Sequence, residues 1–275
     1  MTRRPAVTLI EVLVTMFIMA IGMLALLVLF PLGAVSMGQA LKDDRCASTA
    51  AMAENVANAM NVRYDSNVVA AFGNSATTPK MVYVDPEATT NGYTAFLGGL
   101  IPRTPPSFAT IPHLADRWFS LPDDITFLDG GTPDIFTTGG PIDRGRRYSY
   151  AYLLRLLPSG STNLVQLYAV VYSGRPVNTL ATTTTEWTYT ASTGNPITPL
   201  PPNGLTIANT MATTIKRGGW IFDPVNGYFY RVTNITDSGG STTVELQQNL
   251  IETPSVVVVL DNVAEVFDKG FGWQP

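Results

Sequence analysis

The sequence is poor in charged residues and in the side chains that carry most enzyme chemistry. Only 14% of its 275 residues are charged, about half of the ~25% that is usual in soluble domains. The single cysteine, Cys46, excludes an internal disulfide and any cysteine-clustered zinc or iron–sulfur site. The single histidine, His113, leaves little for histidine-based metal or triad chemistry. These shortages argue against a typical cytosolic enzyme.

Motifs for nucleotide or hydrolase chemistry are lacking as well. The chain has no Gly-x-Ser-x-Gly elbow, no Walker A sequence and no Rossmann glycine signature. Its net charge of −4 argues against nucleic acid as an electrostatic partner, although Arg144, Arg146 and Arg147 form one basic cluster. We therefore expect no enzyme activity, no cofactor and no nucleic-acid partner.

The chain has a long apolar run near its N-terminus. From Val7 to Leu32 the only charged residue is Glu11. As a helix with a rise of ~1.5 Å per residue this run extends about 39 Å, enough to cross a hydrocarbon core ~30 Å thick. A short head with Arg3 and Arg4 precedes it. Positive charge favours the cytoplasmic side, so the rest of the chain is expected outside the cytoplasm.

Two common interpretations of this apolar run are a secretory signal peptide and a plain membrane anchor, and neither accounts for both its length and Glu11. A secretory signal peptide has an apolar core of only ~7–15 residues before a small-residue cut site, for which Ala34–Ser36 is the candidate. A plain membrane anchor explains the length of the run. It does not explain the carboxylate, which costs about 2–3 kcal/mol inside a membrane span without a partner.

The residues around Glu11 resemble a known family. Residues 6–14, Ala-Val-Thr-Leu-Ile-Glu-Val-Leu-Val, are similar to the class III leader and mature N-terminus of type IV pilins and type II secretion pseudopilins. Residues 19–27, with Gly22 among them, look most like PilV-type minor pilins. The resemblance covers roughly residues 4–41.

The chain departs from this family at three positions. Ala6 stands before the cut where the family has glycine, and Val7 stands after it where the family has phenylalanine. Pro31 lies deeper along the helix than the proline of major pilins.

The resemblance implies a route of processing and assembly. A prepilin peptidase would cut between Ala6 and Val7 and methylate the new amine of Val7. Glu11 would pair with that amine on a neighbouring subunit, because two charges that are costly alone become tolerable as a pair, and the pair would set the axial register. The partners implied are the peptidase, the inner membrane before assembly, and other pilin or pseudopilin subunits that pack through the N-terminal helix. The final location would be a filament at the cell surface or in the periplasm.

The fold class expected is α+β, a long N-terminal helix packed on an antiparallel β-sheet head. Thr49, Ala53, Val56 and Met60 recur at helical spacing and predict the helix face that packs on the sheet. The predicted divisions are a leader at 1–6, a transmembrane and assembly helix at 7–32, its amphipathic continuation at 33–64, and a head at 65–275 with a proline-rich loop at 98–122 and a threonine-rich loop at 178–214.

Alternating apolar residues predict the strands of the head. Residues 148–156 and 165–171 form one predicted hairpin. The Asn226-Gly227 pair predicts a second hairpin, with strands at 220–223 and 228–233 joined by a turn at 224–227, and with positive φ at both residues of the pair. The continuous apolar run 256–260 predicts a strand buried on both faces. Two further strands are expected at 186–190 and 242–247.

The remaining alternatives concern metal and anchoring. Asp123, Asp124 and Asp129 lie in a chain segment rich in glycine and proline, but their spacing matches no calcium loop, so we predict no metal site. The rival to a pilin is a single-pass, membrane-anchored extracytoplasmic binding module or adhesin that keeps residues 1–6 and does not polymerise. A secreted enzyme released after Ser36 is the third class.

Overall fold

The computed structural model describes residues 9–75, 79–85, 100–109, 118–121, 125–127, 142–144, 147–157, 164–175, 186–190, 197–200, 202–208, 215–238 and 240–273. The chain forms two compact units, Met1–Arg45 and Cys46–Pro275. Each unit is described by itself.

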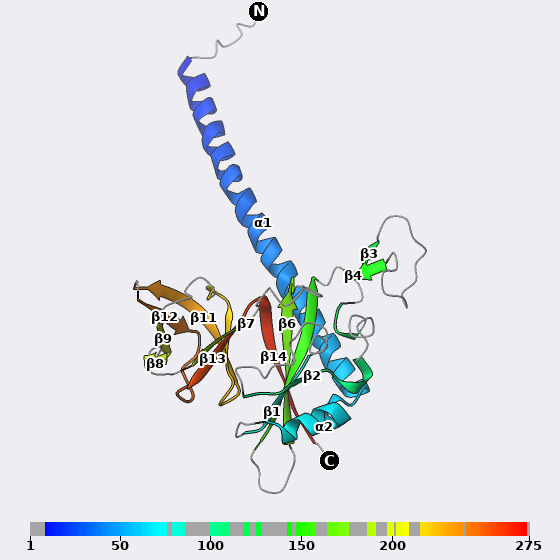
Figure 1. Ribbon diagram of the computed structural model, residues 1–275. Helices are drawn as coiled ribbons and strands as arrows, with labels where there is room; N and C mark the ends of the chain where they lie inside the picture. The colour runs from blue at the N-terminus through cyan, green and yellow to red at the C-terminus, as the bar shows by residue number, and fades with distance from the viewer. Residues whose placement is uncertain are drawn as a thin grey trace, which may run out of the picture. The chain divides into compact units, whose positions relative to one another are not determined.

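One helix dominates the first unit and enters the second. α1 runs from Leu9 to Ala59 without interruption, through Pro31 and Gly33 (Figure 1). Every residue of α1 up to Arg45 is exposed, and burial begins at Cys46. The predicted arrangement of a long apolar helix followed by an antiparallel β-rich head is confirmed.

A second, short helix follows a sharp turn. Asn61 adopts the left-handed conformation, with φ 48°, after which come η1 (Val62–Tyr64) and α2 (Ser66–Gly73). The Asp65 carboxylate caps α2, because it accepts the backbone N–H groups of Asn67 and Val68. This cap places the apolar side of α2 against the sheet.

The first sheet of the head has five strands in the order β14-β6-β5-β1-β2. Its pairs are antiparallel except for the parallel pair β1–β2. The predicted hairpin is confirmed as β5–β6, with a register from Tyr148↔Ser173 to Leu156↔Val165. The strands are β1 (Met81–Val84), β2 (Arg103–Thr104), β5 (Tyr148–Leu156), β6 (Leu164–Ser173) and β14 (Val263–Trp273).

β2 lies in the proline-rich segment 98–122, which the sequence predicts as a loop. This prediction is wrong for residues 103–104 and for the short η3 (Ser107–Ala109). Pro102 and Pro105 flank β2 rather than interrupt it, so its backbone N–H groups stay available for pairing. The carbonyl of Pro102 even accepts the N–H of Tyr83.

The second sheet has seven strands in the order β7-β13-β10-β11-β12-β9-β8, all paired antiparallel. A separate two-stranded pair is formed by β3 (Ile125–Phe127) and β4 (Ile142–Arg144). The seven strands are β7 (Glu186–Thr190), β8 (Ile197–Leu200), β9 (Gly204–Ala208), β10 (Trp220–Asp223), β11 (Tyr228–Asp237), β12 (Ser241–Leu246) and β13 (Val256–Leu260).

The threonine-rich segment 178–214 is not one loop. β7 was expected there, but β8 and β9 were not. Ile197, Leu205 and Ile207 are buried in the core of the second sheet. Threonine is a good strand former because its side chain is branched at Cβ. Its abundance therefore concealed two strands whose alternate positions carry the core residues.

The predicted hairpin with a turn at 224–227 is confirmed as β10–β11, but the conformation of Asn226 differs from its prediction. Asp223 pairs with Tyr228, so four residues form the loop between β10 and β11. Among the described residues of this loop only Gly227 has positive φ, 76°. The Asp223 carboxylate accepts the backbone N–H groups of Val225 and Asn226 at 3.0 and 3.2 Å. These bonds fix the four-residue turn with Asn226 outside the left-handed region.

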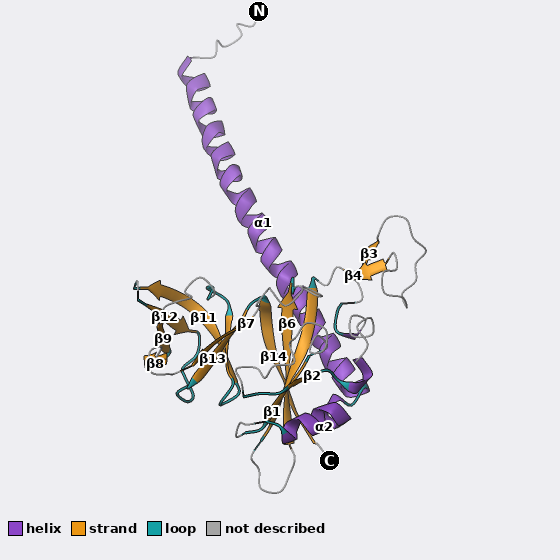
Figure 2. Cartoon of the chain, in the orientation of Figure 1, coloured by secondary structure: helices purple, strands orange, loops and turns teal. Residues whose placement is uncertain are grey.

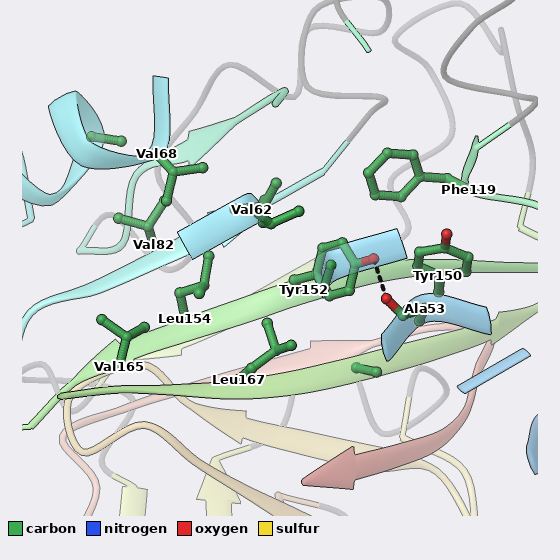
Figure 3. Close-up of a cluster of buried hydrophobic side chains, with 14 of the residues drawn as sticks. Ala53, Val62, Val68, Val82, Phe119, Tyr150, Tyr152, Leu154, Val165 and Leu167 are labelled. Carbon is green, nitrogen blue, oxygen red and sulfur yellow. Dashed lines mark hydrogen bonds between the residues drawn. The ribbon is translucent and has the colours of Figure 1, made fainter. Parts of the chain in front are cut away.

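Both faces of the first sheet are buried. Tyr152, Leu154 and Leu167 lie on the face covered by α2 and by α1 from Cys46 onward, and Figure 3 shows the cluster that they form with Ala53. The intervening residues Tyr83 and Leu153 face the second sheet. The head thus has three layers: the helices, the first sheet and the second sheet. Figure 2 shows the strands of the two sheets in orange and the helices in purple.

β13 confirms the prediction of a strand buried on both faces. Val257 and Val259 pack within the core of the second sheet, whereas Val258 and Leu260 pack toward the first sheet. The second sheet therefore has a core of its own as well as a shared core with the first.

Candidate assembly site on the N-terminal helix

Glu11 lies in the first turn of α1 and is exposed. It is the only charged residue between Leu9 and Leu41. A carboxylate in the first turn of a helix is favoured by the partial positive charge of the helix N-terminus. The position is therefore compatible with a helix, while the apolar residues around it leave the charge without a partner in this part of the chain.

Large apolar side chains cover every side of the helix in the first unit. Leu9, Leu27 and Phe30 are 80%, 74% and 81% exposed. Soluble monomers do not expose apolar surface of this extent, and such surface marks contact with lipid or protein. α1 is long and apolar enough to cross a membrane. The helix therefore suggests a membrane anchor for the head.

Three glycines of α1 lie where the described part of the chain leaves room for a larger side chain. A Cβ at Gly22, Gly33 or Gly38 would meet no other atom within 4 Å. A glycine inside a helix costs roughly 0.5–1 kcal/mol relative to alanine. Small residues let a second helix approach closely. The glycines thus carry a local cost that no side-chain contact among the described residues explains.

Pro31 weakens the same helix locally. Proline has no N–H, so the carbonyl of Leu27 loses its usual helical donor. The hydroxyl of Ser36 donates to the carbonyl of Gly33 at 2.9 Å, a side-chain bond that further perturbs this turn. The surface is hollowed here, and the hollow is lined by Leu26, Leu27, Leu29, Phe30, Pro31, Gly33, Ala34 and Met37.

The candidate residues do not form one cluster. At ~3.6 residues per turn, Gly22 falls about three turns after Glu11 on the same side of the helix, and Pro31 falls on the opposite side. Their effects therefore concern different contacts along one helix.

Several predicted positions lie outside the described residues. These include the cleavage residues Ala6 and Val7 and the weak calcium candidates, Asp123, Asp124 and Asp129. His113 and Arg146 lie outside them too. Within the part of the chain that the structure describes, no three His, Cys, Asp or Glu side chains gather in a way that could hold a metal ion.

The helix face predicted to pack on the sheet does so in the second unit. Thr49, Ala53 and Val56 are buried, and Met60 packs beside them. The hydroxyl of Tyr152 donates to the carbonyl of Ala53 at 2.6 Å. Burial raises the pKa of Tyr152 well above its ordinary value, so the hydroxyl stays protonated as the donor.

Two further polar contacts hold the helix region to β14. Lys269 forms an ion pair with Glu54 at 3.1 Å. Arg63 donates to the carbonyl of Gly270 at 3.5 Å. Neither contact was predicted. The paired residues are 215 and 207 positions apart in the sequence, and a local sequence pattern carries no information about such distant pairs.

Comparison with known proteins gives one finding at the N-terminus. Residues 1–27 match the family described as the prokaryotic N-terminal methylation motif. The matched segment contains Ala6, Val7, Glu11 and Gly22. This motif indicates a precursor of the type IV pilin or pseudopilin kind, and it implies processing by a prepilin peptidase and pilin-type assembly in general. No curated protein and no solved structure matches the chain.

Proposed function

We propose that this chain is a minor pilin or pseudopilin, a structural and non-catalytic subunit of a type IV pilus or a type II secretion-like filament. The observation that carries the proposal is the continuity of two features. The methylation motif at 1–27 overlaps the start of a helix that is exposed from Leu9 to Arg45 and has a single carboxylate between Leu9 and Leu41.

The first step is cleavage between Ala6 and Val7 by a prepilin peptidase, followed by methylation of the Val7 amine. Alanine is the smallest side chain that can replace the glycine usual before the cut, so the substitution is mild. Cleavage removes Arg3 and Arg4 and leaves a positive amine four residues before Glu11.

The second step is assembly through α1. In the inner membrane lipid covers the apolar helix, and in a filament neighbouring helices replace the lipid. Glu11 of one subunit then pairs with the Val7 amine of the next, and the pair sets the axial register. Gly22 allows close approach on the same side of the helix. Pro31 allows the helix to adapt deeper in the packing.

The proposed locations follow from these steps. Before assembly the subunit is a single-pass inner-membrane protein with its head outside the cytoplasm. After assembly the head belongs to a filament in the periplasm or at the cell surface. Among filament subunits we propose a PilV-type minor pilin in particular, because residues 19–27 resemble that kind of subunit.

The test is incorporation into filaments sheared from cells that lack the native subunit. We expect Glu11→Ala and Glu11→Gln to be processed and membrane-inserted but missing from the sheared fraction, because both remove the charge. Thr15→Ala, one turn further along the helix, is the matched control and should enter filaments. Normal incorporation of both Glu11 variants would contradict the pairing role.

The alternative function is an anchored extracytoplasmic binding module or adhesin. It is favoured by Ala6 and Val7, which replace the glycine and phenylalanine usual at the cut. Such a protein would retain residues 1–6 and stay in the membrane fraction, whereas a processed pilin begins at Val7. The mature N-terminus therefore distinguishes the two functions.

A further inference from the structure

β14 is joined to the second sheet by a short connection. All seven strands of the second sheet lie between β6 and β14 in the sequence, so we call it the inserted sheet. β13 ends in the inserted sheet at Leu260, and β14 begins in the first sheet at Val263, after Asn262 in the left-handed conformation with φ 63°. Arg231 and Glu265 form an ion pair between β11 and β14 at 3.4 Å, but both side chains are partly exposed. Such pairs contribute little to stability.

β14 lies at the edge of the first sheet (Figure 1). Among the described strands it pairs with β6 alone, and its register shifts twice, between Val263 and Glu265 and between Asp268 and Phe271. Residues 265–272 are exposed or half-buried, whereas most residues of β6 are buried. An edge position, interrupted pairing and low burial are the features of a segment that opens at low cost in free energy.

The start of β14 covers the first buried turn of α1. Ala264 packs in one cluster with Cys46 and Ala50 of the helix, and Phe267 packs against the same cluster. Burial of α1 begins at Cys46. The residue at which the helix first becomes buried is therefore a residue that β14 contacts.

Polar contacts continue in the same order along both segments. The ammonium group of Lys269 pairs with the carboxylate of Glu54 at 3.1 Å, and Arg63, just after α1, donates to the carbonyl of Gly270 at 3.5 Å. The side chain of Arg63 also lies against Gly272, where a Cβ would stand 2.6 Å from Nε. β14 thus runs alongside the helix from its first buried turn to the segment that follows it.

Other contacts of α1 do not involve β14. Ala53 packs with Tyr152 of β5 and Leu167 of β6, and the Tyr152 hydroxyl donates to the carbonyl of Ala53 at 2.6 Å. The inserted sheet has a core of its own. Detachment of β14 would therefore uncover Cys46 on one side and leave these other contacts in place.

We propose that β14 from Ala264 to Trp273 is a releasable strap, which opens and closes over the first buried turn of α1 while the rest of the head stays folded. The closed strap covers Cys46 and Ala50, and the open strap leaves the helix held by β5 and β6 from Ala53 onward. The strap thus sets the residue at which the head begins to hold α1. This device does not depend on the proposed function, because all of its contacts lie within the head.

The thiol of Cys46 reports the state of the strap in the full chain. It is the only thiol in the sequence and is 3% exposed when the strap is closed. Its labelling by N-ethylmaleimide is followed in the detergent-solubilised subunit at rising urea concentration, beside unfolding by tryptophan fluorescence. The urea dependence of an opening scales with the surface that it exposes. We therefore expect shallow urea dependence and labelling faster than global unfolding permits. Labelling with the full urea dependence of unfolding, down to zero urea, would overturn the strap.

A core variant of the inserted sheet separates local from global opening. Val244→Ala, at a side chain 0% exposed, should lower the stability of the head in the fluorescence titration, because it removes buried methyl groups. The labelling rate of Cys46 without urea should stay unchanged, because Val244 remains packed when the strap opens. A rise in that rate by the same factor as the unfolding constant would overturn the proposal. If Val244→Ala does not fold, the wild-type urea series still decides.

Gly272→Ala acts on the strap itself. The new methyl group would displace the guanidinium of Arg63, so the labelling rate of Cys46 should rise about fivefold, as for a modest loss of local stability. Gly240→Ala is the matched control, because its Cβ would meet no atom within 4 Å, and it should keep the wild-type rate. Equal labelling rates in the two variants would overturn the proposed strap.

Discussion

The two ends of α1 have opposite surroundings. From Leu9 to Arg45 every side chain is exposed, including leucine and phenylalanine. From Cys46 to Ala59 the same helix buries a stripe of small residues against a sheet. The more apolar half is thus the exposed one. Among the described residues nothing buries the more apolar half, whereas the less apolar half packs on the head.

This difference predicts that substitutions in the head affect folding and substitutions in the first unit affect assembly. The free energy of unfolding can be followed by tryptophan fluorescence of the detergent-solubilised chain. All four tryptophans lie after Arg45, so the signal reports the second unit alone.

The largest loss of stability is expected at the buried ion pair between Asp85 and Arg175. Arg175→Met should lower the free energy of unfolding by up to about 3–5 kcal/mol, because it removes the bidentate donor of the buried Asp85 carboxylate, which keeps the ion pair with Arg103 at 3.4 Å. Equal stability of wild type and Arg175→Met in denaturant titrations would contradict the buried pair.

A matched pair of leucines compares the two surroundings directly. Leu167→Ala, at a side chain 1% exposed, should cost about 2–5 kcal/mol through lost burial and a cavity. Leu27→Ala, at a side chain 74% exposed, should leave the unfolding of the head unchanged. The same fluorescence titration measures both variants. A loss of head stability in Leu27→Ala would break the proposed division of the helix.

A smaller effect is expected where the sheet holds the helix. Tyr152→Phe removes the hydroxyl that donates to the carbonyl of Ala53, and should cost about 0.5–1.5 kcal/mol. The control is Tyr64→Phe, at an exposed ring, for which no change is expected. Identical midpoints for Tyr152→Phe and wild type would show that this hydrogen bond does not stabilise the head.

The smallest effect concerns pH. Burial raises the pKa of Asp223 in the folded chain, although the N–H groups of Asn226 and Val225 act against the shift. A raised pKa means that the folded state holds the proton more tightly than the unfolded state. The contribution of Asp223 to stability is then largest below the ordinary carboxyl pKa of ~3.9 and is lost as the pH rises through the raised value.

Asp223→Asn cannot titrate and isolates this contribution. The free energy of unfolding of wild type relative to the variant should fall from acid toward neutral pH. Denaturant titrations over that range measure it. A constant difference, or one that grows with pH, would contradict the raised pKa.

The sequence predicts features that are local and periodic. The apolar run with Glu11, the alternation in β5 and β6, and the run of valines in β13 each predict their element because one segment carries the whole pattern. In contrast, β8 and β9 were missed because they are short, four and five residues long, and lie in a segment whose overall composition is that of a loop. The parallel strand β2 was missed because two residues between prolines have no period.

The arrangement of the head could not be predicted from the sequence. Both faces of β6 are buried because α1 covers one and the inserted sheet the other, and the pairing of β6 with β14 joins Tyr172 to Val263. Likewise Asp85 and Arg175 are isolated charges until the fold brings them together. Such contacts depend on chain topology, which single-sequence periodicity does not report.

The most direct test of the central claim is the N-terminal mass of the chain coexpressed with a prepilin peptidase. The account predicts a mature protein that begins at a methylated Val7, with residues 1–6 removed. A chain that still begins at Met1 or Thr2 in the presence of active peptidase would contradict it and would favour the anchored binding module.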